Sequence, residues 1–378
     1  MTVYWWIFAY TSVVSLFGTI VKKISKNKLL NDKCYLDNKS INLFFAILTF
    51  ALLVFFVGSR NEFNDTYYYR DIFQNYITGD LSQIKDLWEE DSKSKYFLIV
   101  QSLFKHFVSK EYNVWFFALA IFQIGAVIKL YYKYSVDYFM SAYLFIASVS
   151  FVWMMGGIRQ FLAVCIVLYG IDYLVERKTI KFLILVLIAS LFHISAIIWI
   201  PIYFICTSKP WSWKIAVFII GIVLMLFSID TFTTILDDVL EETDYSGITS
   251  NFDSENGVNG IRVLVTCVPW ILALMCKRQI DEDNNQVINI CVNLSVVSSA
   301  IYLLGMFTSG IIVGRLPIYF MLTNYILIPW ILNRYFTPSI RMVMKTACIV
   351  MYFLYFYYDM VIKGTGHYGS ELLNIPYV

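Results

Sequence analysis

Ten apolar runs of spanning or near-spanning length recur along the chain, separated by polar connections. They lie at about 3–21, 41–58, 112–130, 136–155, 158–175, 214–229, 261–276, 286–306, 312–332 and 343–360. A run of about 20 mainly apolar residues is long enough to cross a bilayer as a helix. The pattern therefore predicts an all-α, polytopic membrane protein that forms a single integral membrane domain over residues 1–378.

A further apolar stretch, residues 180–206, is longer than one span requires and carries polar residues around His193 at its middle. It fits either one long tilted helix or a hairpin of two short helices. Basic residues concentrate in the cytoplasmic connections of membrane proteins, so their positions distinguish the two arrangements.

Lys22 and Lys23 directly follow the first run, which places that end of the run in the cytoplasm. Only the hairpin then puts 18 of the 29 Lys and Arg residues into cytoplasmic connections. We therefore predict about 12 membrane segments, including a short helical hairpin at 180–206, with both termini outside. His193 is then expected near the outer face.

The composition agrees with a membrane protein and excludes other classes. The chain is 59% hydrophobic and only 15% charged, with a mean hydropathy of +0.66. A net charge of +2 provides no basic surface, which excludes a nucleic-acid partner. The seven cysteines are scattered without a close C-x-x-C pair, so we expect buried thiols, no metal site and no cofactor.

Two long outer loops follow from the predicted topology, at about 59–111 and 230–260. In the first loop, residues 95–110 place apolar and aromatic side chains on one helical face and polar side chains on the other. This pattern predicts a helix that lies in the membrane interface. The second loop carries eight acidic residues and neither lysine nor arginine, so we expect a solvated outer cap.

Several cationic side chains fall on the predicted outer face, where positive charge is disfavoured and each needs a local cause. Guanidinium groups bind phosphate oxygens in bidentate fashion, and a diphosphate carried on a lipid would lie at this depth. We therefore predict that the arginines among them bind a diphosphate. The residues are Arg60, Arg159, Arg262, Arg315 and His193.

Each of these residues also has a simpler interpretation. Arg60 and Arg262 lie at helix ends, where the side chain can extend to the interface without binding a ligand. A single histidine in an apolar run is often a satisfied core residue, which leaves His193 open between the two. Arg159 and Arg315 follow glycines and begin long apolar segments, so a functional role is favoured for both.

The segment "GSRNEFNDTYYYRDIF", residues 58–73, follows the second apolar run directly. It combines Asp65 with Tyr68, Tyr69 and Arg70. Tyrosine rings offer flat apolar faces with a polar rim, which suits stacking on sugars. An aromatic belt at the interface is the alternative, but it would not explain the carboxylates and arginines so close by. We predict a sugar-binding segment.

Three segments, "GSRNEFNDTYYYRDIF", "GGIRQFLAV" and "LFHISAIIWIPIYF", occur in this order between the hydrophobic runs. Together they resemble the EpsG-like polysaccharide polymerases, which are close in role to the Wzy O-antigen polymerases. The resemblance covers roughly residues 40–335. The residues that carry it are Arg60, Asp65, Tyr69, Phe73, Arg159, Gln160, Phe192 and His193.

The resemblance implies a GT-C-like glycosyltransferase of the bacterial inner (cytoplasmic) membrane, with its active site facing the outside. Its donor and acceptor would be undecaprenyl-diphosphate-linked oligosaccharides. A growing glycan would pass from its lipid diphosphate to the non-reducing end of a lipid-linked repeat unit. Membrane lipid and a chain-length regulator are the further partners implied.

Within this resemblance, Asp65, His193 and Arg159 are the catalytic candidates, and Asp65 or His193 would be the base for the acceptor hydroxyl. Gln160 joins the sugar-binding residues. Arginines would stabilise the leaving diphosphate in place of a metal. Asp281 and Asp283 have D-x-D spacing but fall in a predicted cytoplasmic connection, so metal-independent transfer is expected.

Two alternatives share these features. An O-antigen ligase would use the same chemistry and differ only in its acceptor. A lipid-linked oligosaccharide flippase or exporter would also bind diphosphate outside, but it would need polar groups through the midplane, and charged residues are nearly absent from the inner parts of the runs. The polymerase is therefore favoured.

Overall fold

The structure, a computed structural model, describes residues 2–29, 38–90, 92, 94–228, 257–308, 310 and 312–377, without the side chains of 22–29 and 38–42. The chain divides into two compact units, the first made of residues 1–172, 180–197 and 342–378 and the second of 173–179 and 198–341. Within the described ranges the chain is all-α, with two isolated β-bridges as the extended contacts. The all-α prediction is confirmed.

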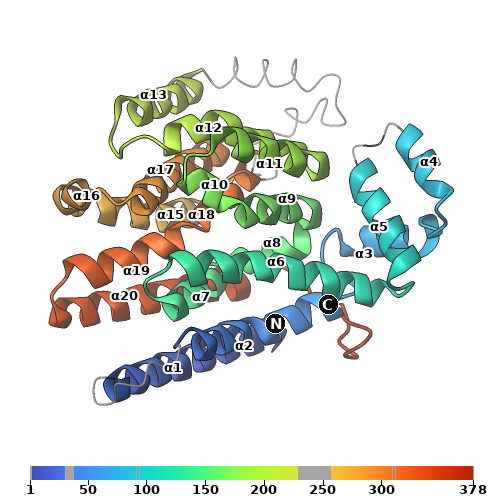
Figure 1. Cartoon of the computed structure of the whole chain (residues 1–378), viewed down its shortest axis with the longest axis horizontal. Helices are drawn as coiled ribbons and strands as arrows, with labels where there is room; N and C mark the ends of the chain where they lie inside the picture. Colours follow the sequence, from blue (N-terminus) through green and yellow to red (C-terminus); the bar gives the residue numbers. More distant parts are fainter. Residues whose placement is uncertain are drawn as a thin grey trace. The chain divides into compact units, whose positions relative to one another are not determined.

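The first unit contains the helices that form the N-terminal half and the C-terminal end of the chain (Figure 1). In it α1 packs on α2 and α7, α2 packs on α6, and α6 packs on α9. The helices are α1 Thr2–Leu29, α2 Asn38–Ser59, α3 Thr66–Asp71, α4 Gln83–Glu89, α5 Lys95–Phe107, α6 Tyr112–Tyr134, α7 Tyr138–Ala147, α8 Trp153–Gly156, α9 Ile158–Tyr169, α11 Thr179–Phe192 and α20 Pro338–Tyr357, with the shorter turns η1 Ile72–Tyr76, η2 Ser150–Val152, η3 Ile194–Ile198 and η7 Tyr358–Ile362.

Helix α2 shows why these runs form packed helices. Its residues Ala46, Phe50, Leu53 and Val57 recur every three or four positions and are fully buried. Phe44, on another face of α2, is 62% exposed. An apolar side chain that is exposed in this way suits contact with lipid, which is as apolar as the side chain itself.

The second unit is built around α17, Gln286–Phe307. Its other elements are α12 Trp199–Cys206, α13 Trp213–Phe227, α15 Gly260–Met275, α16 Lys277–Asp283, η6 Val313–Arg315, α18 Ile318–Met321 and α19 Asn324–Tyr335, while α10 Ile171–Val175 spans the boundary between the units. Helices α12, α13, α15, α18 and α19 all contact α17, which is mostly buried. Small polar residues such as Ser295, Ser298 and Ser299 line α17 and permit this close packing.

Each of the ten predicted apolar runs contains a helix, and the chain is a multi-pass membrane protein by helix length and composition. Among the described residues, however, four helices are long and apolar enough to cross a bilayer, or up to seven if each bent pair is one span. The bent pairs turn by 69° between α7 and the η2–α8 segment, 71° between α15 and α16, and 46° before α19. The predicted number of about 12 segments also counts shorter apolar helices, such as the two of the hairpin at 180–206, and stays a prediction.

The stretch 180–206 folds as two short apolar helices that break at His193. Its two ends meet: the hydroxyls of Thr179 and Tyr203 are 2.6 Å apart, and Arg177 Nη2 donates to Thr207 O at 3.3 Å. A chain whose start and end lie together must turn back between them. The hairpin, and not one long helix, is the arrangement in the structure; its orientation in the membrane stays a prediction.

A cysteine at Lys209, in a background without the native cysteines, should react with a membrane-impermeant maleimide only from the cytoplasmic side. Lys209 follows the hairpin and is exposed, and in the predicted topology the hairpin returns the chain to the cytoplasm. A cysteine at the exposed Lys110, in the predicted outer loop, is the matched control and should react only from outside. Labelling of both from the same side would contradict the topology.

Helix α5 confirms the helix predicted at 95–110, although its position in the membrane interface stays a prediction. In Figure 1 it lies with α3 and α4 at the end where α6 begins. Lys105 Nζ donates to the carbonyls of Phe73 and Ile77, at 2.7 and 2.6 Å, so α5 also holds the end of η1. The second predicted outer loop lies almost wholly outside the described residues, which resume at residue 257.

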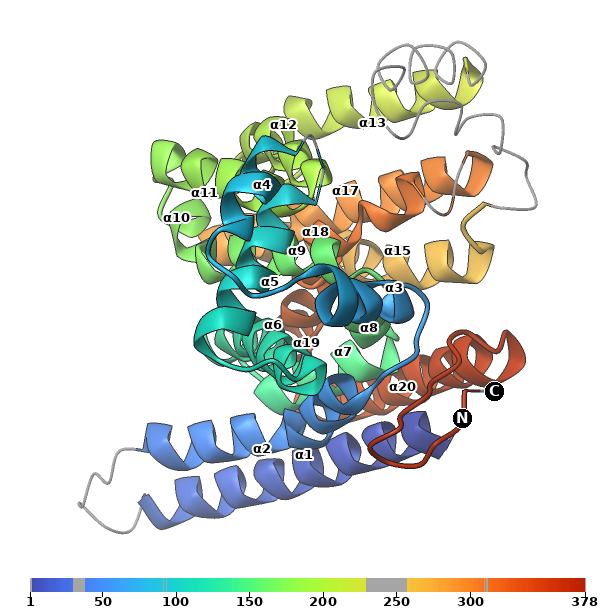
Figure 2. The ribbon, with the colours of Figure 1, turned by 90° about the vertical axis from the view of Figure 1, so that its right-hand side faces the viewer.

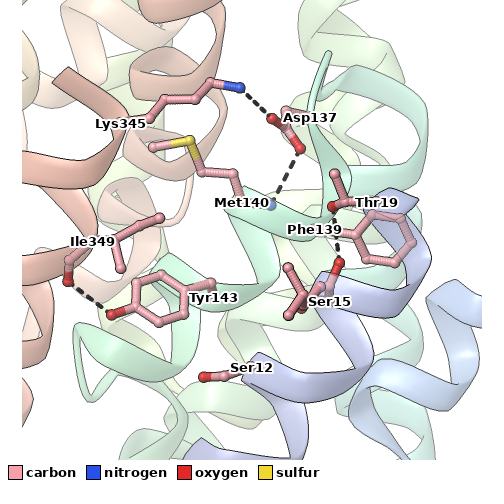
Figure 3. A pocket seen from close by; sticks show the side chains of 10 residues that line it. Ser12, Ser15, Thr19, Asp137, Phe139, Met140, Tyr143, Lys345 and Ile349 are labelled. Atoms are coloured by element: carbon pink, nitrogen blue, oxygen red, sulfur yellow. Dashed lines mark hydrogen bonds and ion pairs between the residues drawn. The ribbon is translucent and has the colours of Figure 1, made fainter. Parts of the chain in front are cut away.

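A hollow of about 380 Å³ lies between α1, α7 and α20 (Figure 3). At its rim Lys345 Nζ of α20 lies 2.7 Å from Asp137 Oδ2, beside the start of α7. Tyr143 of α7 donates its hydroxyl to Ile349 O of α20 at 2.8 Å. These contacts attach α20 to α7, and the lining contains none of the predicted site residues.

Candidate functional site

Arg60 follows α2 directly and is buried, with 1% of its surface exposed. Its Nε donates to Thr66 Oγ1 at 3.1 Å, Nη1 donates to Val57 O, and Nη2 lies 3.5 Å from Met154 O. The guanidinium carbon is 4.7 Å from the centre of the Phe116 ring. Burial lowers the pKa of Arg60 to about 9, which still leaves it protonated at neutral pH. Arg60 therefore fastens the end of α2 to α3 and α8.

Gly156, before Arg159, permits close packing within the chain. A Cβ at Gly156 would come within 2.7 Å of Asn64 Nδ2 and 3.2 Å of the Phe63 ring. Thr66 Oγ1 lies 3.3 Å from Met155 O in the same turn. The two sequence motifs, residues 58–73 and 156–164, are therefore packed against each other, and the close approach that Gly156 permits is to Asn64.

Arg159 in the first turn of α9 is half-buried and bound by two hydroxyl groups, one from α3 and one from the residue before α5. Its Nε donates to Tyr69 Oη of α3 at 2.9 Å, and Nη1 donates to Ser94 Oγ, before α5, at 2.7 Å. Burial raises the pKa of Tyr69 while the adjacent guanidinium opposes the shift, so Tyr69 stays a neutral hydroxyl. These contacts fix the orientation of the Arg159 side chain.

A core rich in aromatic residues packs α3, α5, α6 and α9 together. It therefore includes α3, which carries Tyr69, and α5, which follows Ser94. Phe192, the last residue of α11, packs against this core and brings the third motif to the same place. The buried members of the core are Tyr69, Phe73, Phe97, Tyr112, Trp115, Phe116, Leu119, Ile158 and Leu162.

His193 and Gln160 are joined through Ser195. The Nδ1 atom of His193 is 2.6 Å from Ser195 Oγ, and Gln160 Nε2 donates to the same oxygen at 3.4 Å. Gln160 is buried, at 4% exposure, whereas His193 is half-buried. The structure thus links Gln160 to His193, which the sequence placed in two separate motifs, and Arg159 precedes Gln160 on α9.

The predicted sugar-binding segment divides into exposed and buried residues. Asp65 precedes α3 and is exposed, and Tyr68 is 58% exposed. Tyr69 is only 7% exposed and packs its ring against Phe97 at 5.5 Å between centres. Because its hydroxyl binds Arg159, Tyr69 orients that arginine and does not present its ring at the surface.

The C-terminal tail, residues 363–377, reaches the same motif and was missed by sequence analysis. Gly369 N donates to Glu62 O at 3.0 Å, and Asn61 N donates to Gly369 O at 3.1 Å. Ser370 Oγ donates to Ser59 O at 2.5 Å. In Figure 2 the tail, in dark red, runs beside the segment that leaves α2. The polar sequence "HYGSELLN" after the last apolar helix was the available signal.

Arg70 is bound to this tail. Its Nη1 is 3.0 Å from Glu371 Oε1, and Asn61 Nδ2 donates to the same oxygen at 2.9 Å. The guanidinium also lies over the rings of Tyr67 and Tyr112, at 5.3 and 5.8 Å from their centres. Arg70 is thus paired with a carboxylate of the C-terminal tail.

Arg262 and Arg315 belong to the second unit and are half-buried. Val258 N, just before α15, donates to Gly305 O at 2.9 Å, and a Cβ at Gly305 would lie 3.1 Å from Gly314 N. Both arginines therefore lie near the same end of α17. Their convergence with Arg60 and Arg159, which are in the first unit, stays a prediction.

Asp281 and Asp283 each have a cationic partner. Lys277 Nζ is 3.0 Å from Asp281 Oδ2, and Arg334 Nε is 3.1 Å from Asp283 Oδ2. Within the residues that the structure describes, no group of three or more histidine, cysteine or acidic side chains has the spacing of a metal site.

This arrangement has the parts needed for transfer of a group from an anionic carrier. An oriented guanidinium can bind and stabilise a phosphate leaving group. The His193 imidazole is linked through Ser195 to Gln160, the residue after Arg159, and an exposed carboxylate and exposed aromatic rings lie at the start of α3.

Comparisons with known proteins gave one family. The model described as the EpsG family matches residues 43–377, which is most of the chain and includes all three motifs and the C-terminal tail. No curated protein and no solved structure gives a significant match.

Proposed function

Because the chain belongs to the EpsG family, whose members are membrane proteins linked to polysaccharide biosynthesis, we propose that it is a metal-independent polysaccharide polymerase. It transfers a growing glycan from undecaprenyl diphosphate to the non-reducing end of a lipid-linked repeat unit, on the outer face of the bacterial inner membrane. A GT-C-like architecture is part of this proposal.

The observation that carries the proposal is the fixed orientation of Arg159. The hydroxyls of Tyr69, in α3, and Ser94, just before α5, accept from its guanidinium at 2.9 and 2.7 Å. Cleavage of the bond between sugar and diphosphate leaves negative charge on the diphosphate, and a preorganised cation stabilises that charge without reorganising. Arg315 and Arg262 are proposed as further diphosphate ligands.

Arg60 has a different role in this mechanism from the one expected of it. Its donors are directed to Val57 O, Thr66 Oγ1 and Met154 O, and the side chain is 1% exposed. We therefore assign it to positioning, because it joins the α3 segment to the turn before Arg159. Tyr69 and Gln160 are positioning residues for the same reason.

We propose that Ser195 orients His193 as a neutral imidazole. Ser195 Oγ accepts from Gln160 Nε2 and lies 2.6 Å from His193 Nδ1, to which a hydroxyl can donate. A neutral imidazole that accepts at Nδ1 carries its proton on Nε2. His193 is then suited to donate a hydrogen bond to a phosphate oxygen, and the exposed Asp65 is the proposed base for the acceptor hydroxyl.

Purified protein in liposomes, supplied with undecaprenyl-diphosphate-linked repeat units, should produce a ladder of glycans that differ by one repeat unit. The ladder should form without sugar nucleotides and in the presence of a chelator, because the diphosphate bond supplies the energy. A flippase would move the substrate without lengthening it. A ligase would extend only a lipid A core acceptor, so a ladder without that acceptor distinguishes the polymerase from both alternatives.

A further inference from the structure

Glu371 in the C-terminal tail is held in one place while remaining open to solvent. Its Oε1 accepts from Asn61 Nδ2 at 2.9 Å and Arg70 Nη1 at 3.0 Å, and Tyr112 Oη lies 3.4 Å from Oε2. Its backbone N–H donates to Asn61 Oδ1 at 3.1 Å. Even so, 65% of its side chain is exposed. The carboxylate is therefore oriented but accessible.

The surroundings of this carboxylate combine an aromatic face with both signs of charge. Tyr67, 57% exposed, lies against the Arg70 guanidinium, 5.3 Å from ring centre to carbon, and Arg70 in turn pairs with Glu371. A flat ring stacks on the apolar face of a sugar, and a carboxylate beside an arginine offers an acceptor and donors to its hydroxyls.

The local charge favours a neutral ligand over a phosphate. Arg70 is the one cation in the segment 61–71, which also contains Glu62, Asp65 and Asp71, and Glu371 adds a fourth carboxylate. A diphosphate would be repelled by this excess of negative charge, whereas sugar hydroxyls carry no charge and can donate to carboxylates.

We propose that Glu371, Arg70 and Tyr67 form a sugar-binding subsite, in which the Glu371 carboxylate accepts hydrogen bonds from hydroxyls of a lipid-linked oligosaccharide. This rests on the proposed function and adds a specificity-determining residue to it. The sugar belongs either to the acceptor unit or to the donor glycan, because both present the same hydroxyl chemistry. The C-terminal tail thereby contributes to substrate recognition as well as packing against α2.

The test uses the full chain in detergent or nanodiscs and two separate probes. One is the oligosaccharide released by mild acid from the lipid-linked precursors of the producing cell, and the other is undecaprenyl diphosphate. Glu371→Gln should weaken oligosaccharide binding about tenfold, because hydrogen bonds to a charged group are lost, and leave undecaprenyl diphosphate binding unchanged. Glutamine retains an acceptor for Asn61 and Arg70, so the melting temperature should remain close to that of the wild type.

Glu90→Gln is the matched control, since Glu90 is an exposed carboxylate in the loop 59–111, which also carries Tyr67 and Arg70, and it accepts from Tyr76 Oη at 2.8 Å. It should alter neither affinity. Kinetics then assign the sugar: a raised KM for single lipid-linked units identifies the acceptor, and a raised KM for preformed polymer identifies the donor.

Unchanged oligosaccharide affinity in Glu371→Gln would overturn the subsite. So would a joint loss of both affinities with a lower melting temperature, because that result makes Glu371 a structural residue only. Failure of the wild type to bind undecaprenyl diphosphate would contradict the proposed function, and the two failures are distinguished because each is measured with its own probe.

Discussion

Arg159→Lys should lower the rate of glycan polymerisation by on the order of 100-fold, although the variant keeps its positive charge. A lysine ammonium cannot reproduce the planar fork of a guanidinium, which lets one side chain bind Tyr69, Ser94 and a phosphate in fixed directions. The measurement is the initial rate of ladder formation by purified protein in liposomes, together with the affinity for undecaprenyl diphosphate.

Arg177→Lys is the matched control for this experiment. Arg177 is exposed, lies in a predicted cytoplasmic connection and donates to Thr207 O at 3.3 Å, so the same substitution should change the rate by less than about twofold. Near-normal polymerisation by Arg159→Lys would show that Arg159 acts only through its positive charge. A bidentate contact between its guanidinium and the phosphate oxygens would then not be part of the mechanism.

Asp65→Asn should lower the rate by about 100-fold or more while undecaprenyl diphosphate binding persists. Asparagine keeps the size and hydrogen-bonding capacity of the side chain but cannot take a proton from the acceptor hydroxyl. Asp65 is exposed at the start of α3, and its side chain does not cap that helix, so the substitution should leave the fold intact. The same ladder assay and binding assay measure both effects.

Asp71→Asn provides the control at the other end of α3, where Asp71 Oδ1 accepts from Asn75 Nδ2 at 2.7 Å. It should polymerise normally. If Asp65→Asn makes normal ladders while His193→Ala does not, His193 becomes the base and the proton assignment on its Nε2 is wrong. If both variants polymerise normally, transfer relies on leaving-group stabilisation by the arginines.

The predicted site residues differ in how far sequence could assign their roles. Arg159 was recognised because a charged residue within an apolar run is costly at membrane depth, and the structure gives it fixed partners. Arg60 carries the same charge in a similar sequence context, yet it is 1% exposed and bound by carbonyls. Burial depends on what packs against a side chain, and for Arg60 that includes Phe116 and Met154 from other helices.

The sequence by itself determined the helices, because the hydrophobic pattern that produces them is local and repeats within each segment. It also determined the family through motifs that are each short and continuous. It could not determine how many of the helices are full spans, because bends at the ends of α7 and α15 depend on packing and not on apolar content.

Only the tertiary structure decided which residues share the site. The contact between Arg70 and Glu371 joins positions 301 residues apart, and the link from Gln160 to Ser195 joins α9 to η3, 35 residues apart. No local pattern encodes such contacts, since they form only when the aromatic core brings α3, α9 and the end of α11 together. The sequence therefore determined the helices and the reactive groups, whereas long-range packing decided which groups are buried, paired or exposed to a substrate.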